Sequence, residues 1–156
     1  MRMIRLAGVI ALLSLAAFGQ QSQVYLDQFS LLRGQTDALS KELSDRDIPR
    51  YSSVEEMMKK VLTEPSNRLL ALSRSVNTLN QTILRSWEDA YGKKGGTDEY
   101  VKFEYLMYAC SALSLKLDAL LRFVGAFGSN RSWLDLGTFQ DLPINSALKV
   151  LSQVKP

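Results

Sequence analysis

The chain has 156 residues, with 19 Lys and Arg against 16 Asp and Glu and no histidine. The missing histidine removes the commonest general base and the commonest neutral metal ligand. The single cysteine forbids an internal disulfide and, without histidine, also a Cys/His zinc site or a Cys-His dyad. A Ser-Lys arrangement or a carboxylate pair would remain possible, but no recognisable motif supports either. We therefore expect no enzyme, no metal site and no cofactor.

Residues 1–19 have the pattern of a secretory signal peptide. A positive start, an uncharged apolar run and small residues at a cleavage site are supplied by Arg2, Arg5, Leu6–Phe18, Ala17 and Gly19. A membrane anchor is the weaker interpretation, because the run is shorter than the roughly 20 residues that span a bilayer. We expect cleavage after Gly19 and a secreted, extracellular protein with one domain, residues 20–156.

The apparent basicity of the chain comes mostly from this leader. Without residues 1–19, which include Arg2 and Arg5, 137 residues remain with 17 Lys and Arg against 16 Asp and Glu, a net charge of +1. No basic stripe is left to neutralise phosphates, so we expect no nucleic-acid partner. No later segment is apolar enough over sufficient length for stable membrane insertion.

The first amphipathic pattern after the leader predicts a helix over residues 23–45. Apolar or semi-apolar residues recur at steps of four and three, namely Tyr25, Phe29, Leu32, Thr36, Leu39 and Leu43. Gly34 is a weak point, costing about 1 kcal/mol relative to alanine. Ser53 and Glu56 then form a capping box that predicts a short helix ending near Thr63–Pro65. Residues 46–65 are thus a long connection that carries a short helix.

Two long helices are predicted next, over residues 66–91 and 97–126. The stripe of the first is Leu69, Leu72, Val76, Leu79, Ile83 and Ala90, and the glycine-rich run 92–96 ends it. Thr97 caps the second, whose two apolar rows are Leu106, Cys110, Leu113, Leu117, Leu120, Val124 and Phe127, and Val101, Tyr105, Tyr108, Ala112 and Leu115. The second helix should therefore lie deepest. Cys110 is expected to be a buried thiol, with pairing between chains as the alternative.

An irregular segment is predicted from Gly125 to Pro143, and Asn145 is expected to cap a last short helix with Leu148, Leu151 and Val154 on one side. The links between the helices would then be long, short and long. A short link forces antiparallel neighbours, whereas long links allow the chain to cross over. The predicted fold class is therefore all-α, a long-chain up-up-down-down four-helix bundle with a short or truncated fourth helix.

Two segments give the sequence a family resemblance. Tyr25-Leu-Asp-Gln-Phe-Ser30 followed by Asp37-Ala-Leu-Ser-Lys-Glu-Leu43 resembles the first helix of prolactins, and Ile83-Leu-Arg-Ser-Trp-Glu-Asp89 resembles the Leu-Leu-Arg-Ser-Trp-acidic segment in the second helix of prolactin and growth hormone. The resemblance implies a polypeptide hormone that binds a single-pass class I cytokine receptor of the prolactin or growth hormone type. Receptor-binding residues stay unassigned. The chain departs from the family in Ala90, where a proline is usual, in its missing disulfides and in its short last helix.

Two sequons, at Asn80 and Asn130, would make a secreted chain a glycoprotein, and Asn130 is the better candidate because it falls in a predicted loop. Trp87 and the Met57–Met58 pair are interpreted as packing residues. The alternative function is a secreted helical carrier or adhesion module without hormone activity. It would use the apolar surface of the helix over residues 97–126 to hold a lipid or a partner chain.

Overall fold

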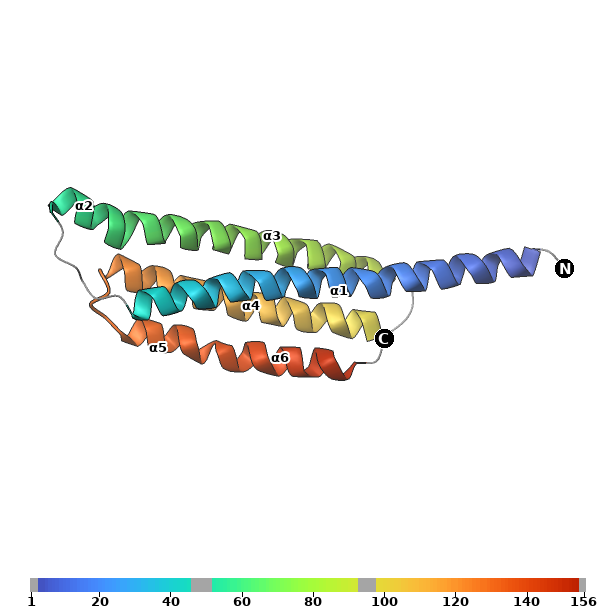
Figure 1. Ribbon diagram of the computed structural model, residues 1–156. Helices are drawn as coiled ribbons and strands as arrows, with labels where there is room; N and C mark the ends of the chain where they lie inside the picture. The colour runs from blue at the N-terminus through green and yellow to red at the C-terminus, as the bar shows by residue number, and fades with distance from the viewer. Residues whose placement is uncertain (1–2, 46–51, 93–97, 155–156) are drawn as a thin grey trace.

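The computed structural model describes the backbone of residues 3–45, 52–92 and 98–154, and the side chains of 21–45, 52–91 and 98–154. Its elements, in order, are α1 (Met3–Ser44), α2 (Val54–Met58), the π-helical η1 (Lys59–Thr63), α3 (Glu64–Gly92), α4 (Asp98–Gly125), α5 (Ser132–Phe139) and α6 (Asp141–Gln153). The helices α1, α3 and α4 and the α5–α6 pair pack lengthwise into a bundle, and each of these four parts is called a layer below (Figure 1). The all-α prediction is confirmed for the described residues, which contain no strand. No helix among these residues has the length and apolarity needed to cross a membrane.

Helices α1 and α3 run antiparallel. Near the end of α1, the carboxylate of Glu42 accepts a hydrogen bond of 2.7 Å from Arg68, which lies at the start of α3. Near the described start of α1, the hydroxyls of Tyr25 and Ser86 lie 2.9 Å apart, and Ser86 is close to the end of α3. The long A-to-B crossover of an up-up-down-down bundle is therefore absent.

The fourth layer also runs antiparallel to its neighbour. Lys116, past the middle of α4, binds Asp141 at the start of α6, whereas Leu106 near the start of α4 lines the same hollow as Leu151 near the end of α6. The four layers consequently alternate in direction (Figure 1). The up-up-down-down prediction is wrong, and the bundle is up-down-up-down.

The topology differs from the prediction because residues predicted to form links between helices are themselves helical. Residues 54–63 continue directly into α3, so only residues 45–53 join α1 to the next helix, and short links join antiparallel neighbours. Ser53 caps α2 as predicted, because its hydroxyl accepts from the Glu56 backbone N–H at 3.1 Å. The predicted stop at Pro65 is wrong. In a regular α-helix the ring of Pro65 would clash with the carbonyl four residues earlier. That carbonyl lies in the π-helical turn η1, whose wider backbone spacing makes room for the ring.

The segment predicted as irregular, residues 125–143, is largely helical. After α4, Phe127 and Gly128 take left-handed backbone angles, with φ of 53° and 68°, and turn the chain back. Gly137 lies inside α5 and is buried. A Cβ atom there would sit 3.7 Å from the Cβ of Ala119, so the glycine marks a close approach of α5 to α4 and no helix end. Pro143 lies in the first turn of α6, where a missing N–H costs little.

The last helix consequently begins at Asp141, before Asn145, so Asn145 is not its cap. Instead, the Asn145 side-chain oxygen accepts a hydrogen bond of 2.7 Å from Arg33 of α1. Together α5 and α6 form a fourth layer that is longer than the truncated helix predicted from the sequence.

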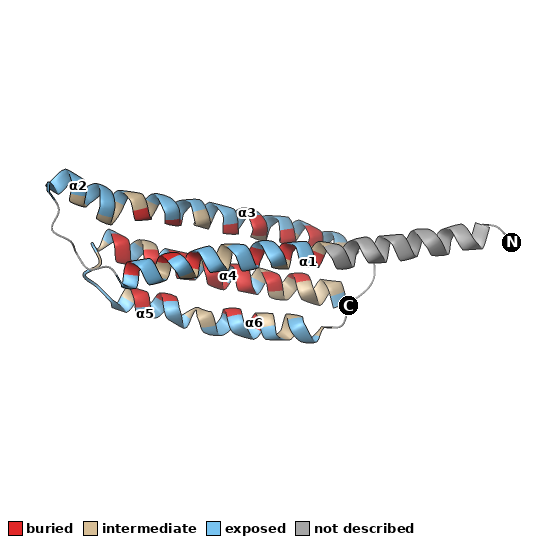
Figure 2. Cartoon of the chain, in the orientation of Figure 1, coloured by how far each residue is buried: buried red, intermediate tan, exposed pale blue. Residues whose placement is uncertain are grey.

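The core lies on the faces that the other helices turn toward α4 (Figure 2). Helix α4 is the most deeply buried, as predicted, and its buried residues are Phe103, Leu106, Ala109, Cys110, Ala112, Leu113, Lys116, Leu117, Ala119, Leu120, Phe123 and Val124. The predicted stripe of α1 is buried apart from the half-buried Leu32. The second predicted row of α4 fails at Tyr108 and Leu115, which are more than half exposed because they lie on the solvent side of the helix.

Candidate functional site

A groove runs along the contact between α1 and α3. It consists of two adjoining hollows of about 390 Å³ and 470 Å³ that share Ser75. The α1–α3 groove is lined by Gln28, Leu31, Leu32, Gln35, Ala38 and Leu39 of α1 and by Arg68, Ala71, Leu72, Arg74, Ser75, Thr78, Leu79 and Thr82 of α3. Both hollows are open to solvent, and their volumes fall within the roughly 300–1,000 Å³ of small-molecule sites.

Small residues widen one of the two hollows. Ala38 and Ala71 are exposed and line the same hollow, one from each helix. The deeper lining residues are leucines, of which Leu39 and Leu79 are almost fully buried. Leu31 also lines the groove, with 63% of its surface exposed. The groove thus offers apolar side chains to a ligand, with polar side chains among them.

The polar wall of the groove comes from α3. The hydroxyls of Ser75, Thr78 and Thr82 each donate to a carbonyl oxygen of their own helix, at 3.1, 2.9 and 2.9 Å. They can therefore accept hydrogen bonds from a ligand, but their protons are already used.

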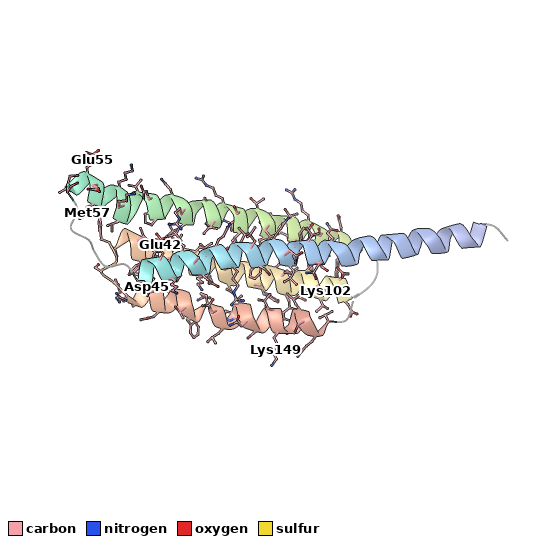
Figure 3. The ribbon with its side chains drawn as sticks, in the orientation of Figure 1. Glu42, Asp45, Glu55, Met57, Lys102 and Lys149 are labelled. Atoms are coloured by element: carbon pink, nitrogen blue, oxygen red, sulfur yellow. The ribbon has the colours of Figure 1, made fainter. Side chains whose placement is uncertain are left out.

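Two arginines lie along this wall, and no lining residue is acidic. The charge of Arg68 is compensated by Glu42, labelled near the end of α1 in Figure 3. The Arg74 guanidinium has no hydrogen-bond or ion-pair partner in the described part of the chain. The groove therefore carries one uncompensated positive charge.

A second polar cluster ties three helices together around Lys116. This side chain is only 4% exposed, and its Nζ lies 2.6 Å from Asp37 Oδ1 of α1 and 2.8 Å from Asp141 Oδ1 of α6. Arg33 lies 3.6 Å from the other oxygen of Asp37, so two cations balance two carboxylates. The lysine donates to both carboxylates, so the cluster is a structural link between α1, α4 and α6.

Two residues of the segments that carry the family resemblance, Tyr25 and Ser86, contact each other inside the bundle through hydroxyls 2.9 Å apart. Gln21 Nε2 donates to the Tyr25 hydroxyl at 2.7 Å and to the Ser86 hydroxyl at 3.1 Å, and the Tyr25 ring packs on Phe103 with centroids 6.0 Å apart. Ile83 is fully buried. Tyr25, Ile83 and Ser86 therefore have packing roles.

Trp87 belongs to an aromatic cluster with Tyr91 and Tyr100. The ring centroids lie 5.9, 5.2 and 6.0 Å apart, so the rings pack on each other and leave no space for a ligand between them. This arrangement agrees with the packing role predicted for Trp87. The Met57–Met58 pair is divided: Met57 is half-buried and Met58 is exposed. The short helix α2, where Figure 3 labels Met57, contributes no buried residue to the core.

Cys110 is a free and fully buried thiol, as predicted. Burial raises its pKa to about 12, so the thiolate needed for disulfide chemistry is suppressed at neutral pH. Pairing between chains through this residue would require the bundle to open.

The two sequons differ in environment. Asn80 is half-buried in α3, and its side-chain oxygen is buried without a hydrogen-bond partner in the described residues. Asn130 is exposed between α4 and α5, and its side-chain oxygen accepts from the Ser132 backbone N–H at 3.2 Å. Glycosylation stays a prediction, with Asn130 the accessible site. Among the described residues, no group of three or more His, Cys, Asp or Glu side chains is placed to hold a metal ion.

The predicted site residues and the groove are separate. Neither sequon asparagine lines the groove, and Arg74 and Lys116 were not predicted from the sequence. The sequence does contain a signal for a buried Lys116, because this lysine is the only charged residue in a helical row of buried positions, Ala109, Ala112, Ala119 and Phe123. No sequence pattern marks Arg74.

Comparison with known proteins identifies no relative. No protein-family model matches the chain. No curated protein and no solved structure matches it either. The resemblance to prolactin and growth hormone therefore stays a prediction.

Proposed function

We propose that this chain is a secreted helical carrier that holds a ligand in the α1–α3 groove and carries out no chemistry of its own. The observation that carries the proposal is the open seam between two long helices, with leucines on its floor and hollows of about 390 Å³ and 470 Å³. The sequence supports a binding role over catalysis, because it contains no histidine and no recognisable catalytic motif.

Export is part of this proposal and rests on the leader pattern of residues 1–19. Cleavage after Gly19 would remove part of α1, which spans Met3–Ser44. It would keep the buried stripe that begins at Tyr25 and all the α1 residues that line the groove. The mature chain would thus retain both the core and the proposed site.

The experiment is expression with the native leader in a eukaryotic secretory line, followed by N-terminal sequencing of the medium fraction. The secreted protein is then titrated with Nile red, a neutral apolar dye. We expect a mature start at Gln20 and saturable dye binding. Ala71→Phe should abolish dye binding by filling the groove. The matched control Asn77→Phe, at an exposed α3 position outside the groove, should bind as the wild type does. Equal binding by both variants would refute the groove as the site.

A prolactin- or growth-hormone-like hormone is the second candidate. Its support is the pair of matching segments, residues 25–43 and 83–89, and the predicted secretion. It ranks second because growth-hormone-like cytokines are up-up-down-down bundles and this bundle alternates. Surface plasmon resonance against prolactin-receptor and growth-hormone-receptor ectodomains tests it directly. Saturable binding by the secreted, monomeric chain would favour the hormone, and its absence would remove that candidate.

A further inference from the structure

We propose that the ligand of the α1–α3 groove is a single-chain amphiphile with an anionic head, of the fatty-acid carboxylate type, and that Arg74 binds the head. The inference rests on the proposed carrier function and adds the chemical class of the ligand and its anchoring residue.

The charge distribution selects an anion. Arg74 is the one lining cation without a partner in the described residues, and none of the lining residues is an aspartate or a glutamate. A guanidinium stays charged at any physiological pH and presents a planar set of donors that matches the two oxygens of a carboxylate. A cationic ligand would find no counter-charge in the groove.

The hydrogen-bonding state of the neighbouring hydroxyls narrows the position of the head. Ser75, Thr78 and Thr82 already donate to backbone carbonyls, so they have no free proton for an anion. The remaining donors are the Arg74 guanidinium, the amides of Gln28 and Gln35 across the groove, and the N–H groups of Arg68 that do not bind Glu42. The head is placed at Arg74 because the charge of Arg74 is not compensated, whereas that of Arg68 is balanced by Glu42.

The shape of the groove selects a linear tail. Its lining on α3 extends from Arg68 to Thr82, which corresponds to roughly 21 Å of helix at 1.5 Å per residue. Leucines of both helices line the groove along this length, and Ala38 with Ala71 adds space in one of the two hollows. An open, elongated groove of this length accommodates an extended alkyl chain better than a compact ring system.

The same features select a free amphiphile over a membrane surface. Anionic bilayers attract clusters of several basic residues, each of which contributes a share of the affinity. The groove has one uncompensated arginine, because Arg68 is paired with Glu42 at 2.7 Å. The proposed occupant is thus a single molecule taken into the groove.

The test measures binding of dodecanoate and dodecanol to the secreted chain by isothermal titration calorimetry, below the concentration at which either aggregates. The two probes share their alkyl chain and differ in head charge. We expect dodecanoate to bind about tenfold more tightly than dodecanol, a difference of about 1.4 kcal/mol. Arg74→Gln should remove this difference and leave dodecanol binding unchanged. Arg85→Gln is the matched control, since Arg85 is also an exposed α3 arginine but lies outside the groove lining.

The outcomes separate this inference from the carrier proposal. If Nile red and both alkyl probes fail to bind, the carrier function itself is refuted. If both alkyl probes bind equally, are blocked by Ala71→Phe and ignore Arg74→Gln, the carrier stands and the anionic head is refuted. Two further results would also overturn the inference: an equal loss of dodecanoate affinity in Arg85→Gln, or binding to anionic phospholipid vesicles without binding of free dodecanoate. A stable dimer by light scattering that binds no amphiphile would assign the groove to a second copy.

Discussion

Replacing Lys116 by methionine tests how much the ion pairs that link α1, α4 and α6 stabilise the fold. The substitution keeps the length of the side chain and removes the charge that Asp37 and Asp141 share at 2.6 and 2.8 Å. Breaking a fully buried ion pair costs about 3–5 kcal/mol, whereas an exposed pair contributes about 0–1 kcal/mol. Here the lysine is 4% exposed but the carboxylates are 44% and 29% exposed, so water solvates part of the charge left behind. We therefore expect a loss of about 2 kcal/mol, between those limits.

The assay is urea and thermal unfolding of the purified chain, followed by far-UV circular dichroism at neutral pH. For a domain of this size the loss corresponds to a fall in Tm of roughly 6–10 °C. Hydrogen exchange should show the earliest loss of protection in α6, because Asp141 is its first residue. The control is Lys149→Met on the outer side of α6, labelled in Figure 3, which should stay within about 0.5 kcal/mol of the wild type.

A triple variant, Lys116→Met with Asp37→Asn and Asp141→Asn, separates the loss of an ion pair from a loss of packing. It should recover most of the stability, because no carboxylate is left without its lysine and Arg33 keeps its hydrogen bond to Asn145. A single variant as stable as the wild type would refute the reasoning. A triple variant no more stable than the single one would show that the lysine acts through its packing volume.

The remaining predictions concern single positions. Gly34→Ala should raise the free energy of unfolding by about 0.5–1 kcal/mol, since Gly34 is exposed within α1 and an added Cβ meets nothing within 4 Å; a lower urea midpoint would contradict this. Cys110 should resist Ellman's reagent at neutral pH in the folded chain and react at once in urea, because its pKa is raised to about 12; fast labelling of the native protein would show that the core opens. In a eukaryotic secretory host, peptide-N-glycosidase should reduce the mass of the wild type and of Asn80→Gln but not of Asn130→Gln, because Asn130 is the exposed sequon residue; a shift lost in Asn80→Gln would reverse the assignment.

The long helices could be predicted from the sequence because their apolar periodicity is repeated over many turns. The expected bounds 66–91 and 97–126 differ from those of α3 and α4 by only one or two residues. Burial of Cys110 followed from its place in a regular row of leucines. Such patterns are decided within one helix, so local sequence is sufficient.

The topology could not be predicted, because whether a glycine or a proline ends a helix depends on its position in the helix and on the helices packed against it. Gly137 looks like a helix breaker but permits α5 to approach Ala119 of α4. Pro143 looks like a stop but lies in the first turn of α6, where proline is tolerated, and Pro65 follows directly on the π-helical turn of η1. Helical residues were thus assigned to links, and links that seemed long suggested crossovers that the chain does not make.

The groove could not be predicted because it is a property of two helices together. Ala38 and Ala71 are unremarkable in their own helices, and the open space follows only once α1 packs antiparallel to α3. The charge of Arg74 is uncompensated only because the residues of both helices that line the groove include no aspartate or glutamate. The burial of Lys116 could in principle have been predicted, because it is the only cation in an otherwise apolar row.

The alternating order of the helices also has a consequence for how the chain reaches its native state. Consecutive helices are antiparallel neighbours, so α3 with α4 and α4 with α6 can each form a hairpin from residues close in sequence. Helical proteins dominated by such local contacts fold in microseconds to milliseconds. With Cys110 as the sole cysteine, no oxidation step delays completion. An exported chain of this design would need no oxidoreductase, and could reach its final form as soon as α6 is free to pack against α4.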